Sequence, residues 1–230
     1  MNTQSGENWP KSEAEALALQ TELGARVIEA PLGRSISTIG GLDVAYDEAR
    51  DELIAAMSRF EFPQMKFVST VMTSGATEFP YIPGLFSFRE LPPLLKLING
   101  CDRNAWPDIL ICDGHGRIHP RRFGLACHLG VVLDHPVIGC AKNHLCGDWE
   151  MPGASRGNWS PVTMDGDVIG AALRTQTGVN PVFVSVGHMT TLDEAIDIVL
   201  TATPNFRLPE TTRAADAAVR AALGENSGRS

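Results

Sequence analysis

The chain has 230 residues, a mass of 24.8 kDa and a formal net charge of −8 at pH 7. This length suits one domain with a substantial core. The negative net charge argues against a protein whose whole surface is basic. A nucleic-acid enzyme is not excluded, because a local basic groove can act within an acidic whole. No apolar run reaches membrane-spanning length, and the polar start of the chain lacks the pattern of a signal peptide.

The five cysteines form neither a C-x-x-C pair nor an even disulfide framework. This usage indicates a reducing compartment, so we predict a cytoplasmic protein that does not enter a membrane. We also predict a single domain over residues 1–230, with loose termini at 1–9 and 225–230.

The first part of the chain has the pattern of a helix followed by strands. Periodic apolar residues predict a helix over residues 10–28, with a capping box at its start. A strand follows at 36–46, and β segments around 53–62 and 65–72 suit an antiparallel meander. A helix is then expected over 87–100, behind a proline-rich loop.

The middle of the chain predicts a strand–helix–strand unit, with strands at 108–112 and 136–140 and a helix at 122–133. Strands joined in this way should be parallel and adjacent. A loop rich in glycine and tryptophan then leads to further strands and two more helices. We expect strands within 160–174 and at 181–185, and helices that begin near 191 and 209.

Four acidic residues lie among apolar neighbours, where a carboxylate is costly unless it is paired or bound to a cation. Asp43 interrupts an apolar strand, and Asp113 ends one. Glu90 lies at a helix start, and Asp216 shares a helix face with inward-pointing residues. Together they suggest a divalent-metal site, and oxygen ligands suit Mg²⁺ or Mn²⁺. The alternative is that each acid is a cap or a surface charge.

Histidines and basic residues surround Asp113. His115 and His119 are poor candidates for zinc, because no second His/Cys pair is spaced to complete a site. A phosphate-contacting or proton-transferring role suits them better, with local hydrogen bonding in a turn as the alternative for His115. A phosphodiester substrate would need positive charge here, and a solvated loop is the alternative. The basic residues are Arg117, Arg121, Arg122 and Lys142.

Two prolines flank Tyr81 and Ile82, which makes this loop stiff and extended. Aromatic and apolar side chains on such loops can insert between bases and replace lost stacking. The alternative is a loop that packs on the core, and the spacing alone favours that alternative.

Taken together, these motifs resemble the endonuclease V family of nucleases, which repair DNA that contains deaminated bases. The matching strings are GLDVAY at 41–46, PYIPGLFSFRE at 80–90, the block at 107–147, PVFVSVGH at 181–188 and RLPETTRAAD at 207–216. They run in the family's order over nearly the whole chain. Phe86 departs from the pattern, because it replaces a more usual aliphatic residue beside the base pocket.

The resemblance implies a ribonuclease H-like α/β fold, in which helices flank a central mixed sheet and the acids gather at one edge. It implies Mg²⁺-dependent hydrolysis, with Mn²⁺ as a substitute, of the second phosphodiester on the 3′ side of a deaminated base, above all hypoxanthine (inosine). The products would be 3′-hydroxyl and 5′-phosphate ends, and the base is not removed. We expect a monomer that acts on damaged DNA in repair.

The resemblance also implies roles for individual residues. The metal-binding and catalytic acids would be Asp43, Glu90, Asp113 and Asp216. Further catalytic residues beside the scissile phosphate would be His119 and Lys142, with phosphate contacts from Arg121 and Arg122. The strand-separating wedge would be Pro80, Tyr81, Ile82 and Pro83. The pocket for a flipped base would be shaped by Gly84, Phe86, Gly114, Gly116, Leu145 and Gly147.

Three alternatives remain at the level of sequence. The first is an endoribonuclease that prefers inosine in RNA. The second is a module that binds deaminated bases without cutting, although the presence of all four acids speaks against it. The third is an unrelated α/β hydrolase of small phosphoesters, which would have no obvious use for the PYIP loop.

Overall fold

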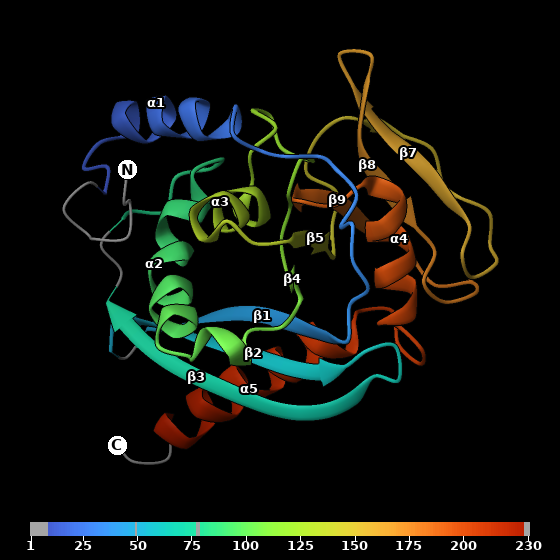
Figure 1. Cartoon of the computed structure of the whole chain (residues 1–230). Helices are drawn as coiled ribbons and strands as arrows, with labels where there is room; N and C mark the ends of the chain where they lie inside the picture. The colour runs from blue at the N-terminus through green and yellow to red at the C-terminus, as the bar shows by residue number, and fades with distance from the viewer. Residues whose placement is uncertain (1–8, 49, 77–78, 228–230) are drawn as a thin grey trace.

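The structure, a computed structural model, describes residues 9–48, 50–76 and 79–227 (Figure 1). In chain order the elements are α1 (Glu13–Gly24), β1 (Thr38–Asp47), β2 (Glu52–Glu61), β3 (Lys66–Ala76), α2 (Phe86–Asn99), a 3₁₀ turn (Arg103–Ala105), β4 (Ile109–Cys112), α3 (Leu125–Leu133), β5 (Val137–Ala141), β6 (Asp148–Trp149), β7 (Trp159–Met164), β8 (Asp167–Leu173), β9 (Val182–His188), α4 (Leu192–Thr201) and α5 (Glu210–Ser227). The strands form one sheet in the order β3-β2-β1-β4-β5-β9-β8-β7-β6.

This sheet combines antiparallel and parallel pairing. β1, β2 and β3 form the expected antiparallel meander, whereas β1, β4 and β5 run parallel. β9 pairs antiparallel with β5 and leads into a second antiparallel part with β8, β7 and β6. The predicted α/β fold, a central mixed sheet flanked by helices, is therefore confirmed, and so is the parallel strand–helix–strand unit.

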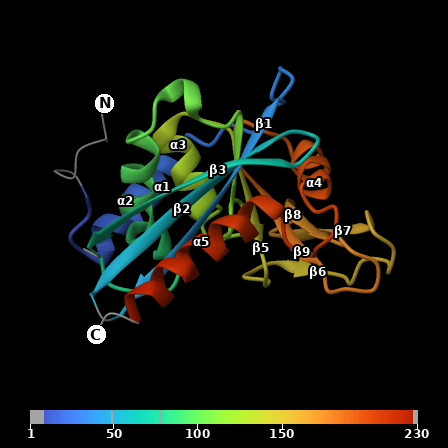
Figure 2. The same cartoon turned by 90° about the horizontal axis from the view of Figure 1, so that it is seen from below.

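Helices cover both faces of the sheet (Figure 1, Figure 2). Apolar residues of α2 and α3 pack on one face, on side chains such as Leu42 and Leu110. On the other face, α4 packs against Ile111 and Ile138, and α5 runs along β1 and β2. Side chains alternate between the two faces along each strand, so both faces of the central strands are apolar and buried.

Trp9 is hydrogen-bonded to α2 at a carbonyl group that a proline leaves without its helical partner. Pro92 lies inside α2 and has no N–H group, so the carbonyl of Phe88 lacks its usual helical donor. The indole Nε1 of Trp9 donates to that carbonyl at 3.0 Å, and the Trp9 ring stacks on His128. The predicted loose terminus over residues 1–9 is therefore wrong at Trp9, while residues 1–8 lie outside the described part of the chain.

The predicted boundaries of α1 and α5 also differ from the structure. α1 ends at Gly24 and not at residue 28, and its capping box is incomplete, because the Glu15 carboxylate accepts from Lys11 N and not from Ser12 N. α5 continues to Ser227, so residues 225–227 belong to a helix, in contrast to the loose end predicted over 225–230. Residues 228–230 lie outside the described part of the chain. No helix within the described ranges is long and apolar enough to cross a membrane.

α5 approaches β1 closely at Gly41. A Cβ atom on Gly41 would lie 2.2 Å from the carbonyl carbon of Thr211, at the start of α5. This distance is far below van der Waals contact, so only glycine lets the helix lie this near the strand. Asp43, two residues further along β1, points to the same face of the sheet as Gly41.

We expect Gly41→Ala to lower the free energy of unfolding by about 1–3 kcal/mol, because α5 must move away from β1. Gly224→Ala is the matched control: Gly224 lies in α5 with no atom near its Cβ position, and alanine is the better helix former by about 1 kcal/mol. Urea unfolding of both variants measures the difference. Equal stability of the two variants would contradict this account of the β1–α5 contact.

Candidate functional site

Three of the predicted acids meet where the parallel pairing of β1 with β4 ends. Leu42 of β1 lies opposite Cys112 of β4, so the next residues, Asp43 and Asp113, are neighbours. The N–H group of Asp113 donates to the carbonyl of Leu42 at 3.2 Å, which holds this arrangement. Glu90 from α2 joins them, and all three acids line a small cavity of about 20 Å³. Residues far apart in sequence thus form one acidic site.

Burial and repulsion by neighbouring carboxylates raise the pKa values of Asp43 and Glu90. Burial, followed by the negative charges of Asp113 and Asp216, raises the pKa of Asp43 to about 7, although Lys142 opposes the shift. Burial, followed by Asp43 and Asp113, raises the pKa of Glu90 well above its usual range. Repulsion between neighbouring carboxylates favours the binding of a proton, and for the same reason it favours the binding of other cations.

Lys142 supplies positive charge at this site. It directly follows β5, the parallel neighbour of β4, and its Nζ lies 2.6 Å from Oδ2 of Asp113. Partial burial lowers the pKa of Lys142, but the hydrogen bond and charge of Asp113 and the charges of Asp43 and Asp216 outweigh it and raise the pKa overall. The ammonium group therefore stays charged at neutral pH.

The carboxylates suit a hard divalent cation by their chemistry, since Mg²⁺ and Mn²⁺ prefer oxygen ligands. Two of them already face cations of the chain itself: Asp113 faces Lys142, and Asp216 accepts from Arg220 Nε at 2.9 Å. In keeping with this, no three His, Cys, Asp or Glu side chains of the described ranges are arranged around one point as metal ligands. The chemistry of the donors fits the ion, while Oδ1 of Asp216 is already engaged by Arg220.

A second cavity, of about 300 Å³, adjoins the acidic one, because Leu125 lines both. We call it the base-sized pocket; four of its predicted residues line it: Gly84, Phe86, Gly114 and Leu145. The other two predicted glycines, Gly116 and Gly147, are not among the lining residues. A Cβ on Gly116 would meet Val186 O at 2.1 Å, and one on Gly147 would meet Thr163 O at 2.7 Å, so both glycines serve close backbone packing.

Sequence reasoning missed other residues of this pocket. Ser87 and Leu125 belong to α2 and α3, and whether their side chains face a pocket depends on how the helices pack. Nothing in the sequence around Gly124, apart from its being a glycine, indicated that it lines a pocket. His115, which the sequence suggested for phosphate contact or proton transfer, lines the pocket instead, and burial lowers its pKa to about 4. The glycine-rich DGHG string was the one available signal for His115.

The PYIP loop divides into an exposed and a buried part. Tyr81 is 66 % exposed, lines the pocket mouth and contacts Phe86 edge to face, with ring centroids 5.9 Å apart. Pro83 also lines the pocket, and Pro80 is exposed. Ile82 instead packs on a buried apolar cluster. The wedge prediction therefore suits Tyr81, whereas the core-packing alternative holds for Ile82.

His119 is not placed with the acids. Its Nδ1 accepts from the N–H of Arg121 at 3.2 Å, so its Nε2 must carry the proton that is donated to Gly84 O at 3.2 Å. Burial, followed by the charge of Arg121, lowers the pKa of His119 to about 4, so the ring is neutral at pH 7. Both ring nitrogens are used, which leaves His119 as part of the pocket wall.

The two arginines expected at phosphates are engaged within the protein. Arg121 donates to Gln20 and, at 2.6 Å, to Gly84 O. Arg122 donates to Met164 O at 2.7 Å and pairs with Asp165 at 3.3 Å. The sequence pattern could not reveal these partners, because all of them lie more than thirty residues away along the chain. As folded, neither guanidinium group is a free phosphate ligand.

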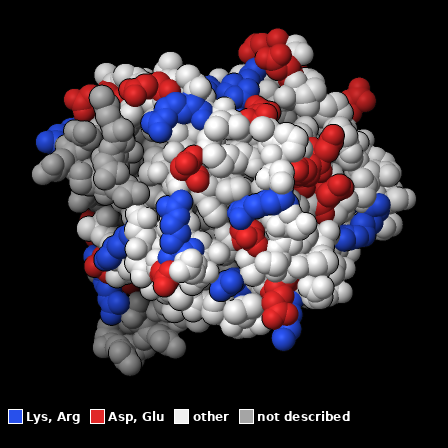
Figure 3. Space-filling model, in the orientation of Figure 1, with Lys and Arg blue, Asp and Glu red and all other residues white. Residues whose placement is uncertain are grey.

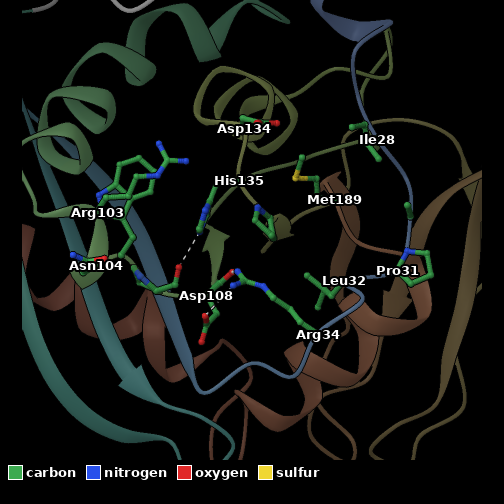
Figure 4. Close-up of a pocket in the computed structure, with 14 residues that line it drawn as sticks. Ile28, Pro31, Leu32, Arg34, Arg103, Asn104, Asp108, Asp134, His135 and Met189 are labelled. Atoms are coloured by element: carbon green, nitrogen blue, oxygen red, sulfur yellow. Dashed lines mark hydrogen bonds and ion pairs between the residues drawn. The ribbon is translucent and has the colours of Figure 1, made fainter.

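Another cavity, of about 740 Å³, lies at the amino ends of β4 and β5, away from the acids (Figure 4). Arg103 and Arg34 lie on either side of His135 in this view. Asp108 pairs with Arg34 at 3.6 Å and Asp134 lies at the cavity rim, so positive and negative charges balance. Figure 3 shows acidic and basic residues interspersed over this face. None of the predicted site residues lines this cavity.

An acidic edge of a mixed sheet beside a base-sized pocket points to the class of α/β nucleases. The chain belongs to the endonuclease V family, whose model, Endonuclease V, matches residues 21–217. It is 47 % identical over 219 residues to Endonuclease V of Streptomyces avermitilis, covering 94 % of this chain and 95 % of that protein. The resemblance seen in the sequence motifs is therefore confirmed, and the protein is a nuclease.

Solved structures agree with this assignment. The crystal structure of the Streptomyces avermitilis endonuclease V matches with a TM-score of 0.88 and 46 % identity, over 95 % of this chain and 96 % of that one. Endonuclease V of Ciona intestinalis, in complex with a 23mer DNA containing an inosine followed by a ribo-adenosine, matches with a TM-score of 0.81 and 29 % identity, over 92 % and 97 % of the two chains.

The raised pKa of Asp43 predicts a pH dependence of stability in the absence of divalent ions. The folded state holds a proton up to about pH 7, whereas the unfolded state loses it near the ordinary value of 3.8. The unfolding free energy should therefore fall as pH rises from about 4 to about 7. Asp43→Asn should weaken this slope and be more stable than the wild type at pH 8 by about 1–3 kcal/mol.

Urea unfolding at several pH values, with a chelator present, measures this slope. Asp167→Asn, at an exposed position on β8, is the control that should keep the wild-type slope. Parallel curves for the wild type and Asp43→Asn between pH 4 and 7 would show that Asp43 does not titrate there.

Proposed function

We propose that this nuclease is a Mg²⁺-dependent endonuclease that acts on DNA containing deaminated bases, above all hypoxanthine. It hydrolyses the second phosphodiester on the 3′ side of the lesion and leaves 3′-hydroxyl and 5′-phosphate ends. The observation that carries the proposal is the joining of an acidic cavity to a base-sized pocket through the shared wall residue Leu125. The inosine-containing DNA in the Ciona intestinalis complex supports the choice of base.

The ion would be held by Asp43 and Asp113, with Glu90 and Asp216 completing the site directly or through water. When bound, Mg²⁺ or Mn²⁺ supplies positive charge beside the attacked phosphate and makes water more acidic. The raised pKa values of Asp43 and Glu90 support this role, because a cation would relieve the repulsion that causes them. Binding of the ion should therefore release protons near neutral pH.

The chain's own groups would assist the hydrolysis. The reaction joins a water oxygen to phosphorus and breaks the bond from phosphorus to the 3′ oxygen, which leaves with a proton. Lys142 stays charged and lies at the acids, so its ammonium group can offset negative charge on the phosphate. Glu90, with its raised pKa, can hold a proton at this site near neutral pH.

Recognition would take place in the base-sized pocket. Its glycines, Gly84 and Gly114, carry no side chains, so a flipped base could approach the backbone of the pocket walls closely. Tyr81 at the mouth would fill the gap that the base leaves in the stack. Phe86 contacts the Tyr81 ring edge to face. An aromatic residue at position 86, in place of the more usual aliphatic one, would therefore help to hold Tyr81 in position as a wedge.

RNA is a second candidate substrate, because the inosine in the Ciona intestinalis complex is followed by a ribo-adenosine. Matched inosine-containing DNA and RNA strands distinguish the two. The proposal also takes the chain to be a monomer and a single domain; the one sheet that joins the described strands supports the single domain. Its cysteines are free, which supports a reducing compartment such as the cytoplasm, where the enzyme would act in DNA repair.

Asp113→Ala should reduce nicking of an oligonucleotide with a single deoxyinosine by at least about 10²–10³-fold, because the ion and Lys142 lose their shared carboxylate. Gel-resolved nicking with and without Mg²⁺ measures the effect, and circular dichroism checks the fold. Asp167→Ala is the control and should cut at the wild-type rate. Cleavage by Asp113→Ala at the wild-type rate would contradict the assignment of Asp113 to the active site.

The same assay tests the alternative of a module that binds deaminated bases without cutting. Binding by the wild type without any cleavage in Mg²⁺ or Mn²⁺ would favour that alternative.

Tyr81→Ala should weaken binding to an inosine-containing duplex by about tenfold, since loss of stacking on one base costs ~1–3 kcal/mol. Tyr81→Phe keeps the ring and should bind like the wild type. Fluorescence anisotropy in a chelating buffer measures both affinities without cleavage. If alanine and phenylalanine variants bind equally well, Tyr81 is not a wedge.

A further inference from the structure

The carbonyl oxygen of Gly84 is an unusual point of convergence in the base-sized pocket. Three side chains donate to this one atom: Arg121 Nη2 at 2.6 Å, Gln20 Nε2 at 3.1 Å and His119 Nε2 at 3.2 Å. Gly84 has a φ of +79°, and a Cβ atom there would lie 2.8 Å from Arg121 Nη2. The end of the PYIP loop is thus held at its backbone.

Gln20 connects this wall of the pocket to the opposite one. Its Nε2 also donates to the carbonyl of Phe123 at 2.9 Å, directly before the pocket residues Gly124 and Leu125. Its Oε1 accepts from Nε of Arg121. One amide group therefore bridges the PYIP loop, the segment that begins α3, and Arg121, which itself holds Gly84.

The burial of Gln20 makes this bridge informative. Gln20 is fully buried on the inner face of α1, between the buried residues Ala16 and Leu23. An apolar side chain would suit that face, and a buried amide is costly unless its donors and acceptor are paired. Both donor positions and the acceptor of Gln20 are used for the pocket walls. Gln20 also lies just before the segment matched by the family model, 21–217.

We propose that Gln20 is a positioning residue, which sets the separation of the two walls of the base-sized pocket and thereby its selectivity for the deaminated base. The inference rests on the proposed function of this pocket. Gln20 touches neither the base nor the acids; it acts through Gly84, Phe123 and Arg121. Without the bridge, the Gly84 wall and the Tyr81 side chain beside it sample more positions, so binding of the base weakens while the chemistry at the acids is retained.

Gln20→Met tests this directly, because methionine keeps the volume and removes all three hydrogen bonds. Leu23→Ala is the matched control: it loosens the packing of α1 on α3 but leaves the Gly84 contacts in place. Hydrogen exchange of the amides in residues 80–88 should become faster in Gln20→Met than in Leu23→Ala. Equal exchange in the two variants would overturn the bridge whatever the enzyme's substrate.

Steady-state kinetics test the link to recognition. For Gln20→Met, KM for an inosine-containing oligonucleotide should rise by about tenfold while kcat changes by less than about twofold, the split expected when ground-state binding is lost. The preference for inosine over adenosine should fall to a similar extent, and Leu23→Ala should keep it. Faster exchange with unchanged KM and preference would overturn the positioning role. A wild-type enzyme with no preference for inosine would instead refute the proposed function, with the exchange result unaffected.

Discussion

The parallel pairing of β1 with β4 brings two carboxylates to one edge of the sheet, and the surrounding elements compensate for their repulsion. Asp43 and Asp113 are partly buried, so water screens their charges poorly. Lys142, at the end of the next parallel strand, lies against Asp113. The same desolvation that raises the pKa of Asp43 makes this edge a favourable place for a divalent cation. The acidic site is thus a consequence of strand order and burial together.

In the proposed function, packing between the two cavities couples base recognition to the chemistry at the acids. Leu125, at the start of α3, separates the acidic cavity from the base-sized pocket, so a base in one pocket would place its neighbouring phosphates near the other. Gln20 on α1 ties the same segment to the PYIP loop. Even the start of the chain contributes, because Trp9 satisfies the Phe88 carbonyl that Pro92 leaves without a donor. The pocket therefore depends on elements that do not line it.

Much of the fold was predictable because its signals are local. Apolar runs and helical periodicity placed the strands and helices, and the strand–helix–strand pattern required parallel neighbours. Boundaries were less accurate: α1 ends early at Gly24, and α5 runs to Ser227. The acids were also predictable, since a carboxylate inside an apolar run is costly enough to need a reason. Asp43 and Asp113 are the clearest examples, and they lie side by side.

By itself, the sequence determined the mixed α/β fold and the family, and it pointed to the acids that line the acidic cavity, because hydrophobic pattern and chemically costly residues are visible in the chain. Only the tertiary structure decided what each polar group around them binds. Arg121 and His119 hold the Gly84 carbonyl, and Ile82 turns into the core while Tyr81 stays exposed. Gln20 gave no signal at all. Hydrogen bonds between distant segments depend on distances that spacing along a chain does not encode.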